Sequence, residues 1–170
     1  ADTGTMLQGS GRVGPIYFVG LSTRFLPGSS PGILTCGGLT PIAPASGTLQ
    51  VELNGLAPGA GYDQLDVRGP VTLTGLALSA TLGFGSAVSD TFTLIQNDGA
   101  DAVVGSFSGL PQGKELYVGR ELFQISYTGG DGNDVVLTRL ITPPPPTLAI
   151  ERVGTNLVRL LWPTNDPPFS

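Results

Sequence analysis

The sequence predicts an all-β protein, and three observations lead to this prediction. Apolar and polar residues alternate in many short segments, as they do in strands that have one buried face. No segment combines the i, i+3, i+4, i+7 apolar spacing of a helix with the capping residues that begin and end one. The 26 glycines and 15 prolines among the 170 residues supply frequent turns between the alternating segments.

The alternating segments follow one another along most of the chain. The pattern is clearest where Leu49, Val51 and Leu53 alternate with two polar residues. In chain order the segments are 49–53, 65–67, 71–74, 76–82, 92–94, 116–118 and 123–127. Turn-rich segments separate them, at 27–32, 57–61, 97–99 and 111–113. Many short strands at this spacing fit a parallel β-helix (a β-solenoid) or a β-sandwich, and no strict repeat period chooses between the two.

Four consecutive prolines at 143–146 divide the chain. A polyproline run is extended and stiff, and it has no N–H groups for a central sheet. We therefore expect a β-rich domain at 1–142, a linker at 143–146 and a C-terminal β-hairpin extension at 147–170. Two strands alone are marginally stable in water, so this extension is either truncated or donated to a neighbouring copy. The candidate self-association residues are Leu148, Ile150, Leu157, Leu160 and Trp162.

The charge of the chain argues against two classes of partner. The net charge is −5, Lys114 is the only lysine, and the seven arginines are scattered. Binding to nucleic acids or to anionic lipids needs clustered cations, so we expect neither. No segment has the roughly 20 apolar residues that a membrane-spanning helix needs. The chain begins at Ala1, and we expect that a leader has been removed or that the sequence is part of a longer one.

The residues offer no catalytic arrangement, so we do not expect an enzyme. The chain has no histidine, which excludes Ser-His-Asp and Cys-His arrangements. The single cysteine, Cys36, follows an apolar segment and is expected to be a buried small residue. Asp63 and Asp66 are three residues apart in an expected strand, so their side chains point to opposite faces. Asp98 and Asp101 lie in a turn-rich segment, where aspartate is common for conformational reasons.

Residues 129–137 (GGDGNDVVL) match one copy of the nonapeptide G-G-x-G-x-D-x-U-x, which binds calcium in tandem arrays. Calcium takes six to eight oxygen ligands, and one copy supplies about half of them. The candidate ligands are Asp131, Asn133 and Asp134. The number of ligands favours a plain hairpin loop, with a calcium site as the alternative. No other cofactor is expected.

Four phrases of the sequence resemble a known family. In chain order they are 25–34 (FLPGSSPGIL), 62–69 (YDQLDVRG), 105–113 (GSFSGLPQG) and 125–138 (ISYTGGDGNDVVLT). They resemble the C-terminal region of bacterial surface proteins built from autotransporter-associated β-strand repeats, and 7–14 (LQGSGRVG) is similar to the last repeat of such an array. The resemblance covers about residues 5–140. It implies a right-handed parallel β-helix closed by a β-rich cap, in a protein exported by a bacterium.

These observations predict an extracellular structural protein at the surface of a bacterium, as a subunit of a fibre or as the stalk of an adhesin. We expect copies of the chain to assemble through β-strand contacts, so the main partner is the chain itself. A passive stalk without self-association is a further alternative. Another is a carbohydrate-binding module of a secreted protein, with glycans as partners. The candidates for its aromatic platform are Tyr17, Tyr62, Tyr117, Tyr127 and Trp162.

Overall fold

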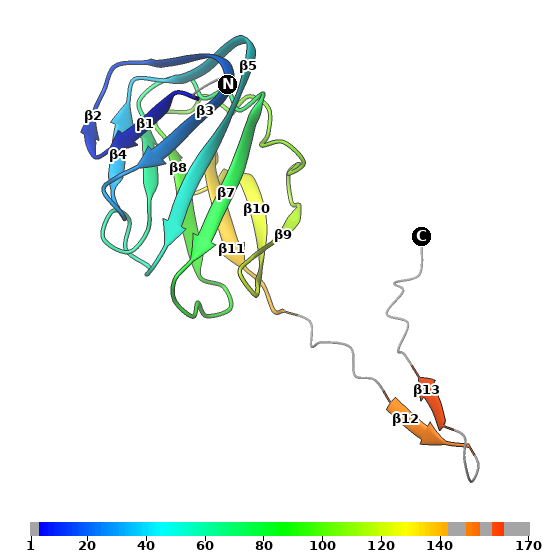
Figure 1. Cartoon of the computed structure of the whole chain (residues 1–170). Helices are drawn as coiled ribbons and strands as arrows, with labels where there is room; N and C mark the ends of the chain where they lie inside the picture. The colour runs from blue at the N-terminus through cyan, green and yellow to red at the C-terminus, as the bar shows by residue number, and fades with distance from the viewer. Residues whose placement is uncertain (1–3, 143–148, 154–157, 162–170) are drawn as a thin grey trace.

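The computed structural model of the chain describes residues 4–142, 149–153 and 158–161, and these residues form strands and no helix. Parallel strands stack into a β-solenoid of about three turns, which antiparallel strands then extend (Figure 1). The structure therefore confirms the predicted parallel β-helix over the β-sandwich alternative. Each coil pairs with the next through its backbone, so the short strands stabilise one another along the axis of the solenoid.

Sheet A forms one side of the solenoid. In spatial order its parallel strands are β1 (Met6–Gly9), β3 (Ile16–Pro27), β5 (Leu39–Leu53) and β7 (Leu76–Leu82). The register places Leu7, Phe25, Leu49 and Leu78 side by side in one row. Phe25 and Leu49 are buried, and the two end members of the row pack against them. The row therefore faces the interior, and the polar residues between these positions face outward.

Sheet B forms the opposite side and is longer. Its parallel part contains, in spatial order, β2 (Gly11–Arg12), β4 (Ile33–Cys36), β6 (Gln64–Val67) and β8 (Thr91–Asn97). Antiparallel pairing continues it through β11 (Asp134–Arg139), β10 (Glu121–Gly129) and β9 (Glu115–Val118). The register aligns Leu34, Leu65, Ile95 and Val135, all of them buried. One apolar row thus crosses from the parallel to the antiparallel part.

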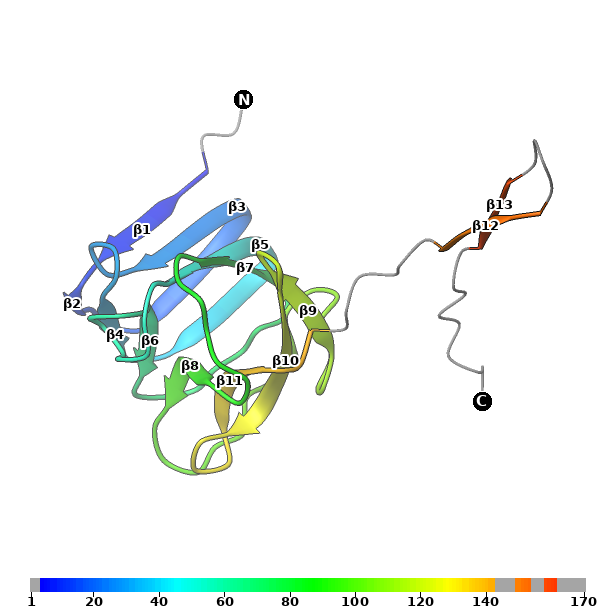
Figure 2. The ribbon, with the colours of Figure 1, turned by 90° about the horizontal axis from the view of Figure 1, so that it is seen from below.

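The antiparallel strands close the C-terminal end of the solenoid. Because β9 lies against β7, sheet B curls around the end of the core and meets sheet A (Figure 2). Phe92 is fully buried there, and its ring contacts Tyr62, Phe84 and Phe123 edge to face at centroid distances of 5.4, 6.1 and 6.0 Å. We call β8 to β11 and the loops between them the closed end.

A tyrosine holds one loop of the closed end in place. The Tyr127 hydroxyl accepts the backbone N–H of Phe107 at 3.0 Å and donates to the carbonyl of Leu110 at 2.5 Å. The Phe107 ring is fully buried beside Tyr127. The loop therefore contributes an aromatic side chain to the core while a single hydroxyl pairs two of its backbone groups.

One expected strand is absent as a strand. Residues 71–74 form only single bridges, between Val71 and Leu39 and between Thr72 and Val104. Val71 and Leu73 are nevertheless buried. The alternation therefore correctly predicted which side chains face the core, although the segment forms single bridges on each side and no continuous ladder.

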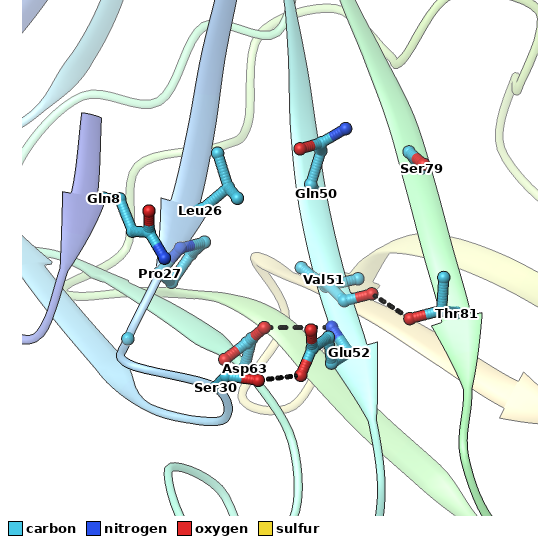
Figure 3. Close-up of a pocket in the computed structure, with 11 residues that line it drawn as sticks. Gln8, Leu26, Pro27, Ser30, Gln50, Val51, Glu52, Asp63, Ser79 and Thr81 are labelled. Carbon is cyan, nitrogen blue, oxygen red and sulfur yellow. Dashed lines mark hydrogen bonds between the residues drawn. The ribbon is translucent and has the colours of Figure 1, made fainter. Parts of the chain in front are cut away.

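The loop between β3 and β4 is tight because two glycines meet in it. A Cβ atom on Gly28 would lie 2.3 Å from backbone atoms of Gly32, and Gly28 has a φ of +87°. A side chain at this position would therefore clash and strain the backbone. The predicted turn at 27–32 is confirmed, and it brings Ser30 over the outer face of sheet A (Figure 3).

The C-terminal extension contains a two-stranded antiparallel sheet, β12 (Ala149–Arg152) and β13 (Val158–Leu161). The expected hairpin pairing is thus present in the described part of this segment. The proline run at 143–146 lies outside the described residues, so its role as a linker stays a prediction.

Candidate functional site

The C-terminal hairpin carries an exposed apolar pair, with Arg152 two residues from Ile150 on the same face. Ile150 lies opposite Leu160 in the register, and the side chains are 67% and 61% exposed. Glu151 lies opposite Arg159 and forms an ion pair with it at 2.9 Å. Because successive side chains alternate, the ion pair and the apolar pair occupy opposite faces. The other predicted self-association residues, Leu148, Leu157 and Trp162, lie outside the described residues.

The N-terminal end of the solenoid has an apolar hollow. Its volume is about 200 Å³. Two threonines and six larger side chains line it, the latter being Leu7, Ile16, Tyr17, Phe18, Val19 and Phe25. Phe18 and Phe25 are buried and touch edge to face at 5.2 Å, while Tyr17 and Val19 are 64% and 61% exposed. The hollow is the place where the side chains of a further coil would lie.

Strands at this end have a free edge among the described residues. β1 and the first part of β3 each pair on one side only, β1 with β3 and β3 with β5. The carbonyl of Thr5 accepts the N–H of Arg24 in β3, and that of Gly9 accepts the N–H of Gly28 just after β3. The N–H of Ile16 donates to the carbonyl of Gly38. Backbone groups alternate between the two edges of a strand, so those of Met6 and Tyr17 face away from the sheet. We call this region, with its hollow, the open end.

A polar groove crosses the outer face of sheet A (Figure 3). It has a volume of about 190 Å³, and it takes side chains from all four strands of the sheet. Gln8 and Gln50 contribute amides, Ser79 and Thr81 contribute hydroxyls, and Leu26 contributes a small apolar patch. Amides and hydroxyls in a row can bind a polar chain by hydrogen bonds.

The carboxylates in this groove serve to hold the coils together. Asp63 accepts the backbone N–H groups of Gly32 and Glu52, at 2.8 and 2.9 Å. Burial raises the pKa of Asp63, and these two hydrogen bonds only partly offset that effect. Glu52 accepts the Ser30 hydroxyl at 2.5 Å (Figure 3). Both oxygens of Asp63 thus have backbone partners, and the arrangement acts as a clamp between neighbouring segments.

The predicted calcium loop is the turn between β10 and β11. Asp131 is exposed, whereas Asn133 and Asp134 are buried. Asp134 accepts the backbone N–H of Asn97 at 2.9 Å, and the Asn133 amide donates to the carbonyl of Asp101 at 2.9 Å. Two of the three candidate ligands therefore fasten the last residue of β8 and the segment after it to this turn.

The turn holds a buried carboxylate and lies beside two buried amide oxygens. Burial raises the pKa of Asp134, the Asn97 bond lowers it, and the nearby Asp131 raises it further. The Oδ1 atoms of Asn97 and Asn133 are buried without a hydrogen-bond partner. Within the described ranges, no three acidic, histidine or cysteine side chains gather as a metal site would require. Calcium binding stays a prediction.

The remaining candidate residues are dispersed. Asp66 bonds to Arg68 at 2.7 Å and to the Thr35 hydroxyl at 3.2 Å, so its partners differ from those of Asp63. Cys36 is fully buried in the core, as predicted, and burial raises its pKa. Of the four tyrosines, Tyr62 and Tyr127 are buried, and Tyr17 and Tyr117 are exposed on β3 and β9. Trp162 lies outside the described residues.

Sequence reasoning missed the lining of the open end. Leu7, Phe18 and Phe25 alternate with polar or exposed residues only over short stretches interrupted by glycines. No alternating segment is recognised before residue 49, so the sequence predicts neither their burial nor their place at the end of a stack.

Two further findings concern membrane-spanning helices and similarity to known proteins. In the part of the chain that the structure describes, no helix could cross a membrane. No family model, curated protein or solved structure compared with the chain matches it. The likeness to autotransporter-associated repeat proteins therefore rests on the four sequence phrases alone.

Proposed function

We propose that this chain is a non-catalytic, extracellular structural protein of a bacterium whose copies assemble into a surface fibre through β-strand contacts. The observation that carries the proposal is the C-terminal hairpin. It forms a separate two-stranded sheet with Ile150 and Leu160 exposed on one face. A two-stranded sheet is marginal in water, and burying these side chains against another sheet stabilises both partners.

The architecture of the body supports a structural role. Its backbone is paired coil by coil, and charged residues make up only 12% of the sequence. Strand addition to a sheet edge supplies affinity from backbone hydrogen bonds and specificity from alternate side chains. When the donated and accepting surfaces differ, the contact is heterologous, and repetition produces a filament unless the rotation closes a ring.

Analytical ultracentrifugation and negative-stain electron microscopy test this function on the full chain. We expect concentration-dependent assemblies and fibres from the full chain, and monomers after deletion of residues 143–170. Equal assembly by both forms would show that the tail is not the donor. A full chain that stays monomeric at all concentrations contradicts the fibre and favours a passive stalk.

Two double variants in the hairpin provide a matched comparison. Ile150→Ser with Leu160→Ser removes the apolar pair, and Glu151→Ser with Arg159→Ser removes the ion pair on the other face. We expect the first variant to weaken assembly at least about tenfold, corresponding to about 1.4 kcal/mol, and the second to change it little. The opposite order would show that electrostatic contacts drive assembly.

The polar groove of sheet A favours the carbohydrate-binding alternative. Its amides and hydroxyls suit hydrogen bonding to sugar hydroxyls, but none of its described lining residues is aromatic. It therefore supports that alternative less well than the hairpin supports assembly. A glycan array distinguishes them, with Gln50→Ala as the variant and Gln112→Ala, outside the groove, as the control. Binding that only Gln50→Ala removes would establish the carbohydrate function.

A further inference from the structure

We propose that the open end of one copy receives the β12–β13 hairpin of a second copy, with Ile150 and Leu160 facing the apolar hollow. This inference rests on the proposed function, because it names the surface that accepts the donated strands. Three observations support it: the shape and lining of the hollow, the way the chain closes its other end, and the distribution of charge.

The hollow and the hairpin are complementary in polarity. The hollow holds about 200 Å³ and is bordered by the buried rings of Phe18 and Phe25. Ile150 and Leu160 form an apolar pair across the hairpin. Side chains of this kind gain about 1.5–3 kcal/mol each when they are fully removed from water. The apolar pair of the hairpin therefore has a matching surface at the open end.

The backbone at the open end can accept a strand. β1 has four residues, as do β12 and β13. Outward-facing N–H and C=O groups on β1 and on the first part of β3 are available to such a strand among the described residues. Pairing them with a hairpin satisfies these groups and covers the hollow in the same step.

The closed end shows that this chain already uses antiparallel strands to end the solenoid. There β11 adds to the parallel strand β8, and β10 adds to β11. One face of this pair buries Phe123, Ile125 and Leu137 over the core. An antiparallel hairpin added to the open end would repeat this arrangement with the strands of another copy.

Charge favours a second copy as the occupant. Residues 4–51 contain two cations, Arg12 and Arg24, and no acidic residue. Residues 52–142 contain ten acidic residues and four cations, so the half of the body that includes the closed end is strongly negative. The hairpin itself carries Glu151, Arg152 and Arg159, so this argument concerns the bodies of the two copies. Bringing the open end of one body near the acidic half of the next places opposite charges together, which steers their encounter.

Disulfide cross-linking between two single variants of the full chain tests the contact. Val19→Cys places a thiol at the hollow, and Leu160→Cys places one on the hairpin. Mixed under oxidising conditions, they are expected to give a dimer in which mass spectrometry finds residue 19 joined to residue 160. The control is Val104→Cys mixed with Leu160→Cys, since Val104 is 58% exposed but lies outside the hollow. The native Cys36 is fully buried and does not compete.

Lysine substitutions at positions 19 and 104 give a second readout. Lysine on an edge strand discourages the addition of another strand. We expect Val19→Lys to raise the concentration needed for assembly at least about tenfold, and Val104→Lys to leave it unchanged.

The outcomes separate this inference from the proposed function. Suppose that assembly needs the tail, but that the 19–160 disulfide does not form and Val19→Lys has no effect. That result overturns the open end as the acceptor and leaves the proposed function standing. Absence of assembly by the unmodified chain overturns both.

Discussion

The two ends of the solenoid differ in how the apolar core is covered. At the closed end, antiparallel strands cover the core, and Phe92 has aromatic neighbours on several sides. At the open end, Phe18 and Phe25 contact each other but border a hollow of about 200 Å³. Both ends begin from similar apolar side chains on parallel strands. The difference, among the described residues, is that a further layer of strands covers only the closed end.

This difference shows that the middle coils of a parallel solenoid are stabilised by their neighbours, whereas a terminal coil needs additional strands to cover it. An interior coil has paired neighbours on both sides, whereas a terminal coil leaves backbone edges and apolar side chains uncovered. In the described residues, β9, β10 and β11 cover one end, and no such layer covers the other. Measurements that contrast the two ends therefore test the architecture directly.

The largest expected difference comes from removing an aromatic ring at each end. Phe92→Ala is expected to lower the free energy of unfolding by about 4 kcal/mol, because it leaves a cavity in a fully packed site. Phe18→Ala is expected to cost about 1–2 kcal/mol less, because one side of that ring already borders the hollow. Chemical denaturation of both variants measures the difference. Equal losses would show that the open end is packed as well as the closed one.

A smaller effect is expected from the hydroxyl that anchors the loop of the closed end. Tyr127→Phe leaves the buried N–H of Phe107 without its partner and is expected to cost about 2 kcal/mol. Tyr117→Phe is the control, since Tyr117 is 61% exposed and its hydroxyl change is expected to be nearly neutral. Amide hydrogen exchange should show faster exchange at Phe107 in the first variant only. Unchanged exchange there contradicts the anchoring role.

The smallest and pH-dependent effect involves the ion pair between β10 and β11 at the closed end, whose glutamate also bonds to the segment after β7. Glu121 accepts hydrogen bonds from Ser86, after β7, and from Arg139 on β11, the latter at 2.8 Å. Burial alone would raise the pKa of Glu121, but these bonds and the Arg139 charge lower it overall. The open end has no counterpart, since residues 4–51 contain no acidic side chain.

The sign of the pH effect follows from the lowered pKa of Glu121. A carboxyl whose pKa is lower in the folded state stabilises the fold above its ordinary pKa of 4.5 and loses this effect as the pH falls. Glu121→Gln is therefore expected to cost about 1–2 kcal/mol at pH 7 and progressively less below pH 4.5. Thermal denaturation across pH measures the gap. A gap that widens on acidification would reverse the assignment.

Much of the core was predictable from local patterns. The alternation of Leu49, Val51 and Leu53 correctly identified buried positions, and so did that of Phe123 and Ile125. The early strands were harder to recognise. β3 contains an exposed Gly20, and its register with β5 shifts on either side of that residue, so no long alternation is visible.

The candidate site was only partly predictable. Ile150 and Leu160 were identified from their apolar pattern, and the structure places them opposite each other on an exposed face. The open end was not identified, because nothing local distinguishes Phe18 from an interior core residue such as Leu49. Asn97 was also missed, since its contact with Asp134 joins residues 37 positions apart.

The sequence by itself determined that the chain forms strands, where many of the turns lie, and which side chains avoid water. These properties depend on short-range alternation and on the backbone preferences of glycine and proline. Only the tertiary structure decided which strands pair, that the pairing changes from parallel to antiparallel after β8, and that one end is closed while the other is open. The reason is that strand partners lie far apart in the chain, so the register of one coil on the next is set by packing across the whole core.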